Sequence, residues 1–243
     1  MQTVRRFLMK PKLLDTYCKA GGAGYGFSLA GFDVVGVDKE PQPNYPFRFY
    51  QGDAVEFIAK FGCDFDHIHA SPPCQFASEL TPMEHRSKHK NWIPETREAL
   101  IATGKLYDME NVENARRYLI NPIMLCGSMF GLGVWRHRYF EMHPSISLLT
   151  PTCNHGNIPV LISGTRRRNN DRFEFTAQQC RDASGLFWMT RKEMDEAIPP
   201  AYTHWLGSQV ITRLTPREPD KGDSATKAGL SLPAHLSVYQ GLS

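Results

Sequence analysis

The chain has 243 residues, of which 41% are hydrophobic and 22% are charged, with 28 Lys and Arg against 25 Asp and Glu. This length permits one substantial α/β domain, and the near-average apolar content excludes wholesale disorder. No apolar run approaches the roughly 18 residues of a membrane helix, and the basic start lacks the apolar stretch of a secretory signal. We therefore expect a cytoplasmic protein without membrane contact. A net charge of +3 is too small to indicate a nucleic-acid binder.

Short apolar runs alternate with helical segments through the first half of the chain. The predicted strands are residues 12–17, 32–37, a third run ending near 53, 65–70, 106–109 and 123–126. Helices are predicted after the first glycine cluster, ending near 27–31, and at 54–61 and 94–104. This alternation indicates βαβ units, and therefore a mostly parallel sheet with helices on both faces.

The second half of the chain is less regular. Residues 144–189 are rich in Asn, Gly, Pro, Thr and Arg, and we expect a loop-rich insertion there. Residues 190–214 regain helical character and are predicted to return to the main domain, which begins at residue 1 and ends near 143. The polar, Pro- and Gly-rich residues 215–243 are predicted to form a loosely held tail.

The six cysteines are scattered through the chain and are predicted to be reduced thiols. Cys153 and His155 form a C-x-H pair that could contribute to a zinc site with Cys180 or His143. However, structural zinc sites usually have paired ligand spacings, and no CxxC occurs. The pair is more typical of an ordinary loop, so no metal is expected.

Glycines and acids follow three successive predicted strands. Gly21 and Gly22 would let the backbone approach a ligand, and Asp38 could accept hydrogen bonds from a ribose diol. Asp53 follows the third strand, where a carboxylate could accept from an amino group. Either acid alone is more typical of a helix cap or a solvated turn. Together, at the meeting edge of parallel strands, they predict a site for an adenosine-type ligand.

The most specific signal is a Ser-Pro-Pro-Cys run that ends at Cys74. Two prolines after a strand stiffen the loop and remove two N–H donors, so the cysteine projects at the carboxyl edge of the sheet. Alone, this run also fits a buried cysteine in a proline turn. A Glu-Asn-Val string begins at Glu110 after the next strand, and Arg136 and Arg138 are expected on one face of a further strand.

These motifs, in this order, resemble those of the DNA cytosine-5 methyltransferases, over about residues 12–141 and weakly over 190–213. The resemblance implies a Rossmann-like, S-adenosylmethionine-dependent methyltransferase fold with a small target-recognition insertion at 144–189. It also implies methyl transfer to C5 of a cytosine that is flipped out of double-stranded DNA.

The same resemblance implies roles for the catalytic residues. Cys74 would attack C6 of cytosine, and nearby cations would raise its thiolate fraction. Glu110 would protonate or hydrogen-bond N3, and Arg138 would contact O2. Arg136 would support the cysteine loop, and Asn111 would help to fix that loop.

For the cofactor S-adenosylmethionine, the resemblance places Tyr17 against adenine, Asp38 on the ribose hydroxyls and Asp53 on the adenine amino group. The glycines of the first turn would make room for the methionine part. The predicted cofactor-binding residues are Tyr17, Gly21, Gly22, Asp38, Asp53 and Pro72.

Three positions depart from the family's pattern. Lys19 stands where a small residue is usual, and Gly133-Val134 replaces the Pro-Gln that normally precedes the two arginines. The closing Gly-Asn dipeptide is absent. We interpret these departures as marks of a compact, divergent branch of the kind found in phage genomes.

Two basic clusters are candidates for DNA contact. Arg86 and Lys88 follow the nucleophile, where the family carries a loop that closes over the flipped base. Arg166, Arg167 and Arg168 lie in the insertion, and arginine suits base edges in the major groove. A solvated surface explains either cluster about equally well. Phosphate contacts from either would make binding salt-dependent.

Double-stranded DNA is the expected partner of a monomeric enzyme, and a restriction enzyme is a further candidate partner. Two alternatives stay open. The same cysteine chemistry could act on a free pyrimidine nucleotide or deliver another group. A catalytically silent relative could bind DNA only, although the intact set of Cys74, Glu110 and Arg138 favours an enzyme.

Overall fold

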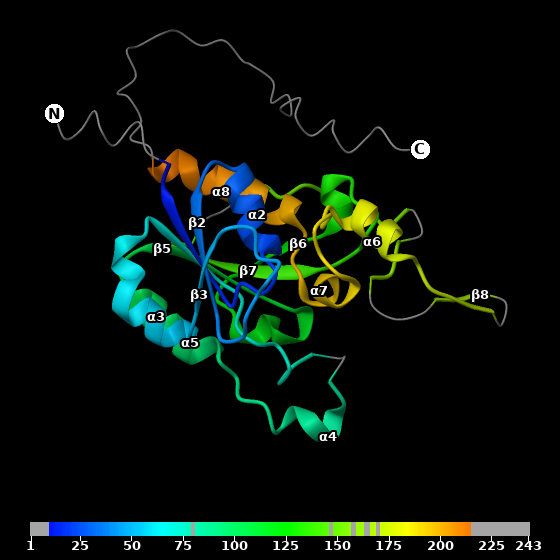
Figure 1. Cartoon of the computed structure of the whole chain (residues 1–243), viewed down its shortest axis with the longest axis horizontal. Coiled ribbons are helices and arrows are strands. Elements are labelled where there is room, and N and C mark those ends of the chain that lie inside the picture. Colours follow the sequence, from blue (N-terminus) through cyan, green and yellow to red (C-terminus); the bar gives the residue numbers. More distant parts are fainter. Residues whose placement is uncertain are drawn as a thin grey trace, which may run out of the picture.

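The computed structural model describes residues 10–78, 81–145, 148–156, 159–162, 166–168 and 171–214, so the tail predicted at 215–243 lies outside the described residues. Seven strands form one sheet in the order β3-β2-β1-β4-β5-β7-β6 (Figure 1). The strands are β1 (Lys12–Thr16), β2 (Asp33–Asp38), β3 (Arg48–Gln51), β4 (His67–Ala70), β5 (Leu106–Asn111), β6 (Ile123–Leu125) and β7 (Arg138–His143). The first five strands are parallel, and β7 runs antiparallel between β5 and β6. The predicted mostly parallel sheet is therefore confirmed.

Helices cover both faces of this sheet, as predicted. On one face, α2 (Gly22–Leu29) packs beside α8 (Pro200–Leu214), and on the other α3 (Ala54–Phe61) packs beside α5 (Ile93–Ala102) (Figure 1). The short α4 (Met83–Arg86) projects from the body below the sheet in this view. Within the described residues, no helix combines the length and the apolar character needed to cross a membrane.

The second half holds the remaining helices and a small hairpin. These elements are α6 (Ala177–Ser184), α7 (Arg191–Glu196) and the antiparallel pair β8 (Arg166–Arg168) and β9 (Asp171–Phe173). Short 3-10 helices occur at η1 (Gly62–Asp64), η2 (Glu113–Tyr118) and η3 (Gly127–Phe130).

Within residues 144–189, which are expected to be rich in loops, the structure has a helix that the sequence analysis does not predict, α6. Thr176 and Gln179 form a reciprocal capping box at its start, and Gly185 ends it in the left-handed conformation with φ of 75°. Both signals are visible in the sequence, but the helix spans only eight residues and presents a weak apolar stripe. Periodicity alone therefore does not reveal it.

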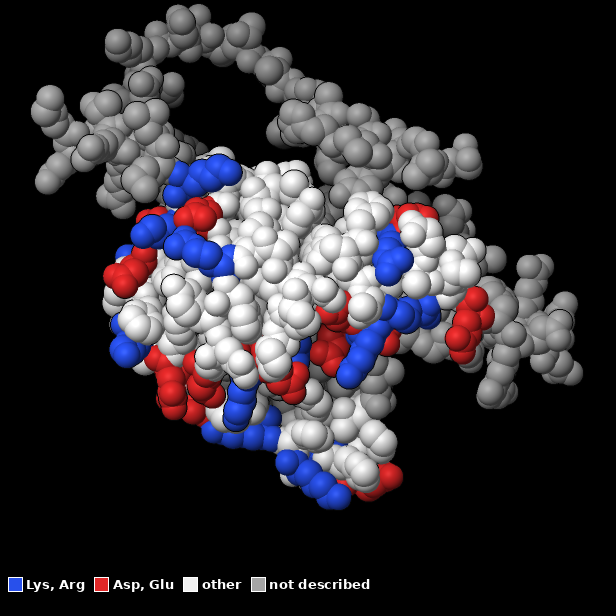
Figure 2. Space-filling view, in the orientation of Figure 1, with Lys and Arg blue, Asp and Glu red and all other residues white. Residues whose placement is uncertain are grey.

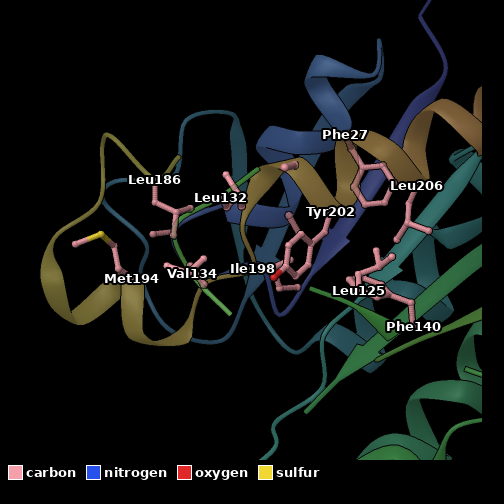
Figure 3. Close-up of a cluster of buried hydrophobic side chains, with 14 of the residues drawn as sticks. Phe27, Leu125, Leu132, Val134, Phe140, Leu186, Met194, Ile198, Tyr202 and Leu206 are labelled. Carbon is pink, nitrogen blue, oxygen red and sulfur yellow. The ribbon is translucent and has the colours of Figure 1, made fainter. Parts of the chain in front are cut away.

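One large apolar core joins the sheet to the second half of the chain. Phe27 of α2, Phe140 of β7 and Tyr202 of α8 lie in the same cluster as Leu186 and Met194 of the α6–α7 region (Figure 3). All five side chains are almost completely buried. The segment around α6 and α7 therefore packs into the core of the sheet rather than around a core of its own.

Candidate active site at the carboxyl edge of the sheet

The topology places several chain segments at one edge. From β1 the chain leads outward to β2 and β3, then returns to β4 on the other side of β1, which makes β1/β4 a topological switch point. The carboxyl ends of the parallel strands meet at this edge. The antiparallel β7 begins there too, because Asn111 pairs with Tyr139. A cleft of about 1210 Å³ opens at this edge. Its lining includes Tyr17, Lys19, Asp38, Asp53, Pro72, Cys74, Glu110, Asn111, Arg136 and Arg138.

Glu110, near the end of β5, is held by two partners. Its Oε1 lies 3.0 Å from Nε of Arg138, and its Oε2 accepts a hydrogen bond from the hydroxyl of Ser71. Only 7% of the Glu110 side chain and 15% of the Arg138 side chain are exposed. This shielding strengthens the ion pair relative to one on the surface. The two side chains are thus fixed against each other beside the Ser-Pro-Pro-Cys loop.

Cys74 is half-buried in a loop that Asn111 anchors. The Asn111 Nδ2 donates to the carbonyl oxygen of Pro72 over 2.9 Å, and the carbonyl of Cys74 accepts from the amides of Ala77 and Ser78. Asn111 thus makes the kind of loop contact that the sequence analysis assigns to it.

The electrostatic setting of Cys74 differs from the expectation. Burial and the carboxylate of Glu110 raise the pKa of the Cys74 thiol, and Arg138 opposes them only in part. Arg138 acts in the expected direction, but burial and Glu110 outweigh it, so the net pKa of Cys74 is raised in the free protein. The thiol is protonated at neutral pH, and a ligand that neutralises Glu110 would lower its pKa.

Arg136 is half-buried, and its contacts differ from those expected. It donates to the carbonyl of Met194 over 3.1 Å and also to that of Asp195, near the end of α7, while its own carbonyl accepts from Tyr202 over 2.6 Å. Burial and the neighbouring Arg138 lower the pKa of Arg136 to about 9. The residue therefore fixes α7 and α8 to the start of β7, and the expected support of the cysteine loop is corrected accordingly.

Two acids at successive strand ends face the same cleft. Asp38 accepts from the amide of Glu40 on one carboxylate oxygen and from the amide of Lys19 on the other. Asp53 caps α3, with Oδ1 accepting from the amides of Val55 and Glu56. Asp53 Oδ2 has no hydrogen-bond partner within the part of the chain that the structure describes. Both carboxylates keep lone pairs that can accept further donors.

Tyr17 lies at the end of β1 in an unusual backbone conformation, with φ of 56°. Its hydroxyl shares a 2.8 Å hydrogen bond with that of Thr96 on α5. Burial raises the pKa of Tyr17 to about 12, so the ring lines the cleft as a neutral phenol. Sequence reasoning missed Thr96, because no local pattern links it to the first strand.

Lys19 also adopts a positive φ, of 46°, at the position where the resembling family has a small residue. Its ammonium nitrogen lies 3.4 Å from Glu40 and 3.6 Å from Glu196. These acids belong to the loop after β2 and to the end of α7. Lys19 therefore bridges two segments that are remote in sequence at the rim of the cleft.

The two glycines of the first turn serve the packing of the chain. A Cβ at Gly21 would lie 2.9 Å from Tyr45 and Pro46, and one at Gly22 would lie 2.3 Å from the carbonyl oxygen of Ile198. Neither glycine lines the cleft. These contacts give both glycines a packing role, and their expected role toward a ligand stays a prediction. Their missing side chains leave space for other segments of this protein.

A buried polar cluster lies next to the site, and sequence reasoning missed it. His67 and His69 of β4 both hydrogen-bond the carboxylate of Asp108 on β5, over 2.7 and 2.6 Å. The fourth member, Asp15 of β1, accepts from the hydroxyl of Tyr45 over 3.0 Å. The alternation of histidines in β4 is the one local signal for this cluster.

The predicted DNA contacts are only partly within the described structure. Arg86 in α4 donates to the carbonyl of Thr81 over 3.0 Å, and Lys88 follows it on an exposed segment. Arg166, Arg167 and Arg168 form β8, and their side chains lie outside the description. Figure 2 shows both signs of charge interspersed on the visible face, so this face carries no single-sign field of the kind that steers DNA.

No family model and no curated protein matches this sequence. Among solved structures, a methyltransferase from Entamoeba histolytica, EhMeth, is similar with 11% identity and a TM-score of 0.57, over 86% of this chain and 100% of that one. The Dnmt2 methyltransferase of S. pombe is similar with 12% identity and a TM-score of 0.55, over 85% of this chain and 99% of that one.

A putative DNA modification methyltransferase from an E. coli prophage is 20% identical with a TM-score of 0.44, over 63% of this chain. The present chain covers about half of that protein, 53% of its length. The first two similarities show that the chain has a Rossmann-like methyltransferase fold.

Proposed function

We propose that this protein transfers a methyl group from S-adenosylmethionine to C5 of a cytosine in double-stranded DNA, through a covalent bond between Cys74 and C6. One observation carries the proposal. Cys74, Glu110 and Arg138 line the same cleft as Tyr17 and the strand-end acids. This reaction needs a nucleophile with an acid and a cation beside it. It also needs acceptors for an adenosine-type ligand next to them.

The residues of the cleft suit S-adenosylmethionine. Asp38 and the free Oδ2 of Asp53 are acceptors for ribose hydroxyls and for the adenine amino group, and Tyr17 offers an aromatic ring. Carboxylates also favour a cationic ligand. When bound, this cofactor supplies an electrophilic methyl group on a positively charged sulfonium.

The other residues act on the cytosine ring. The Cys74 thiolate would add to C6, which increases electron density at C5 and negative charge at N3. After the methyl group is transferred to C5, loss of the C5 proton to a base and breaking of the C6–S bond would release Cys74 and restore the aromatic ring. Glu110 would hydrogen-bond or protonate N3, and Arg138 would donate to O2. Ser71 and Arg138 already orient the Glu110 carboxylate in the free protein, so little reorganisation is needed. Glu110 must carry a proton to donate to N3, and in this neutral form it would no longer raise the pKa of Cys74.

The decisive experiment is methyl transfer to duplex DNA, followed by mass analysis of the nucleosides. We expect 5-methylcytosine from the unchanged protein and a loss on the order of 10³-fold or more in Cys74→Ser. Cys63→Ser is the matched control, because Cys63 is exposed and does not line the cleft. DNA that contains 5-fluorocytosine should form a denaturation-resistant adduct with the unchanged protein and with Cys63→Ser, but not with Cys74→Ser. Full activity of Cys74→Ser, or no adduct, would refute the mechanism.

The alternatives give different products in the same assay. Transfer of another group changes the mass added to cytosine, and activity on a free nucleotide is detected by replacing DNA with deoxycytidine monophosphate. A silent DNA-binding relative leaves treated DNA open to methylation-sensitive digestion. The arrangement of Cys74, Glu110 and Arg138 favours catalysis over silence.

For the DNA itself, we propose that Arg86 and Lys88 contact phosphates and that residues 144–189 recognise the target sequence, with Arg166, Arg167 and Arg168 toward the bases. In this assignment, residues 1–143 and 190–214 form the catalytic unit of a compact, phage-type enzyme. Binding to DNA weakens as salt rises, and each lost phosphate contact makes the slope of log affinity against log salt less steep by about 0.9. The double variant Arg86→Ala and Lys88→Ala should thus have a slope less steep by about 2. An unchanged slope would show that these residues lie away from the DNA.

A further inference from the structure

Four side chains with metal-ligating atoms meet beside the cleft, and one of them, His137, also lines it. Cys126 follows β6, His137 precedes β7, and Cys153 and His155 come from the irregular segment 148–156. Their ligand atoms all lie within 4.8 Å of one another. Three segments of the chain therefore bring two thiols and two imidazoles to one point.

The distances within this Cys126/His137/Cys153/His155 cluster are those of a tetrahedral coordination shell. Zinc bonds of about 2.3 Å to sulfur and 2.0 Å to nitrogen imply edges of about 3.5 Å between S and N and about 3.3 Å between two N atoms. The S–N distances are 3.3 Å from Cys126 to His155, 3.1 Å from Cys153 to His155, and 3.7 Å from Cys153 to His137. The two Nε2 atoms lie 3.3 Å apart.

Hydrogen bonding alone does not explain this geometry. Nε2 of His155 has three neighbours, Cys126 Sγ, Cys153 Sγ and His137 Nε2, each within 3.3 Å. A ring nitrogen has either one N–H or one lone pair, so it can make one good hydrogen bond and not three. A cation between the four atoms satisfies all of them at once.

The surroundings of the cluster also resemble those of a metal site. Nδ1 of His137 lies 3.8 Å from a carboxylate oxygen of Glu113, which is a common outer partner of zinc-bound histidine. The hydroxyl of Ser128 lies 3.3 Å from Cys126 Sγ and 3.6 Å from Cys153 Sγ. Trp135 stacks on the ring of His155 at 4.2 Å.

We propose that Cys126, His137, Cys153 and His155 bind a structural zinc ion. Two thiolates and two imidazoles fill a tetrahedral shell and leave no open position, which is the pattern of a structural rather than a catalytic site. A bound metal would hold the segment 148–156 in place. This segment has no helix or strand, and it exposes side chains such as Leu149, which is 97% exposed. The metal ties this segment to β6 and to the start of β7.

This site differs from the one weighed from the sequence. Cys180 is buried and donates to the carbonyl of Leu161 over 3.8 Å, and His143 stacks on Tyr107. Neither belongs to the cluster. The true neighbours of Cys153 and His155 come from distant positions with no regular spacing. The proposal thus replaces the expectation that the chain binds no metal, and it holds whether or not the proposed methyl transfer is correct.

Zinc content tests the proposal directly. Tag-free protein, purified without chelator from zinc-supplemented cells, should contain about one zinc per chain by elemental mass spectrometry. Cobalt added to the chelator-treated protein should give the visible bands of tetrahedral cobalt and a thiolate charge-transfer band. Less than about a tenth of an equivalent of zinc, together with no tetrahedral cobalt spectrum, would overturn the proposal.

Variants separate this site from adventitious binding. Cys153→Ser and His155→Ala should lose the zinc, whereas Cys63→Ser should keep it, because the exposed Cys63 lies outside the cluster. His155 is exposed, so the variant should keep the fold, which circular dichroism checks. A chelator should lower the melting temperature of the unchanged protein but not that of His155→Ala. Zinc content that is equal in all four proteins would place the metal elsewhere.

Discussion

The two faces of the central sheet bury different kinds of side chain, although the same strands form both faces. Side chains alternate along a strand, so Leu14 and Ile68 point to one face while Asp15 and His69 point to the other. The face under α3 and α5 is mainly apolar over β1, β2 and β4, and on β7 it holds one buried carboxylate, Glu141, which pairs with Arg97 of α5. The face under α2 carries four buried ionisable groups, from β1, β4 and β5.

The polar face is organised around Asp108. Burial favours its neutral form, but His69 and His67 outweigh this effect and lower the pKa of Asp108 to about 2. For His69, burial opposes the charged form, and the Asp108 carboxylate outweighs it and raises the pKa to about 9. The rings of Phe27 and Phe32 cover these histidines from α2 and the loop that follows it.

The difference suggests separate roles for the two faces: one mainly stabilises the fold, and the other carries ionisable groups toward the cleft. Apolar burial contributes stability wherever it occurs, whereas buried charges cost desolvation and tolerate the loss of a partner poorly. On β5 the polar face continues from Asp108 to Glu110, which reaches the cleft beside Arg138. The buried ionisable groups of this face thus lead to the proposed active site. The apolar side chains on the opposite face stabilise the strands that carry these groups.

The largest effect should come from Glu110→Gln, at the cleft end of the polar face. Gln can accept from Ser71 and Arg138 but cannot deliver a proton to the substrate, so we expect the methylation rate to fall about 10²- to 10⁴-fold. Glu56→Gln, on the exposed side of α3, is the control. Single-turnover methylation of duplex DNA measures the effect, and thermal melting checks the fold. An equal rate in both variants would remove Glu110 from the mechanism.

Asp108→Asn should break the polar face without touching the cleft. It leaves the imidazolium of His69 buried without its counter-charge, and loss of one partner from a buried pair costs about 3–5 kcal/mol. Urea unfolding at neutral pH measures the loss, with the exposed Asp64→Asn as the control. A loss below about 1 kcal/mol would mean that His69 is neutral in the folded state.

Much of this fold could be predicted, because its signals are local. The helix at 54–61 has the same bounds as α3, since Asp53 caps it and an apolar stripe follows. The position of the site also followed from topology. Strand ends of a parallel sheet meet at one edge, and the residues after β1, β2, β3, β4 and β5 all line the cleft.

The remaining features depend on segments that are remote in the chain. The space beside Gly22 is filled by Ile198, and Arg136 finds its partners at the end of α7. The raised pKa of Cys74 follows from burial and from Glu110, neither of which a motif reports. The Cys126/His137/Cys153/His155 cluster has no regular spacing, so only the folded chain brings it together.

On the apolar face, Ile68→Ala tests the supporting layer. Ile68 is fully buried in β4 between the histidines, and removal of its side chain should cost about 2–5 kcal/mol of unfolding free energy. Ile101→Ala is the matched control, because Ile101 on α5 is 52% exposed. The affinity of the cleft for S-adenosylmethionine should change little as long as the variant is folded. A loss equal to that of Ile101→Ala would mean that the layer is loosely packed.

The smallest effect concerns the pH dependence that Asp15 gives to the polar face. Burial raises the pKa of Asp15 from 3.8 to about 7, against the opposing influence of His69 and Tyr45. Between these two values the folded state holds a proton that the unfolded state has released. Stability should therefore fall as pH rises from about 4 to 7, by at most about 1.4 kcal/mol per pH unit, and this contribution should level off above pH 7.

His69 behaves in the same direction over a later window, because its pKa is raised from 6.5 to about 9. Its stabilising contribution is complete below the lower value and is lost as pH rises through the higher one. Asp15→Asn should remove the first decline and keep the second. Urea unfolding at about one-unit steps from pH 4 to 9 measures both slopes. Equal slopes for the variant and the unchanged protein between pH 4 and 7 would show that Asp15 is ionised in the folded state, and that the polar face carries one more buried charge than its pKa implies.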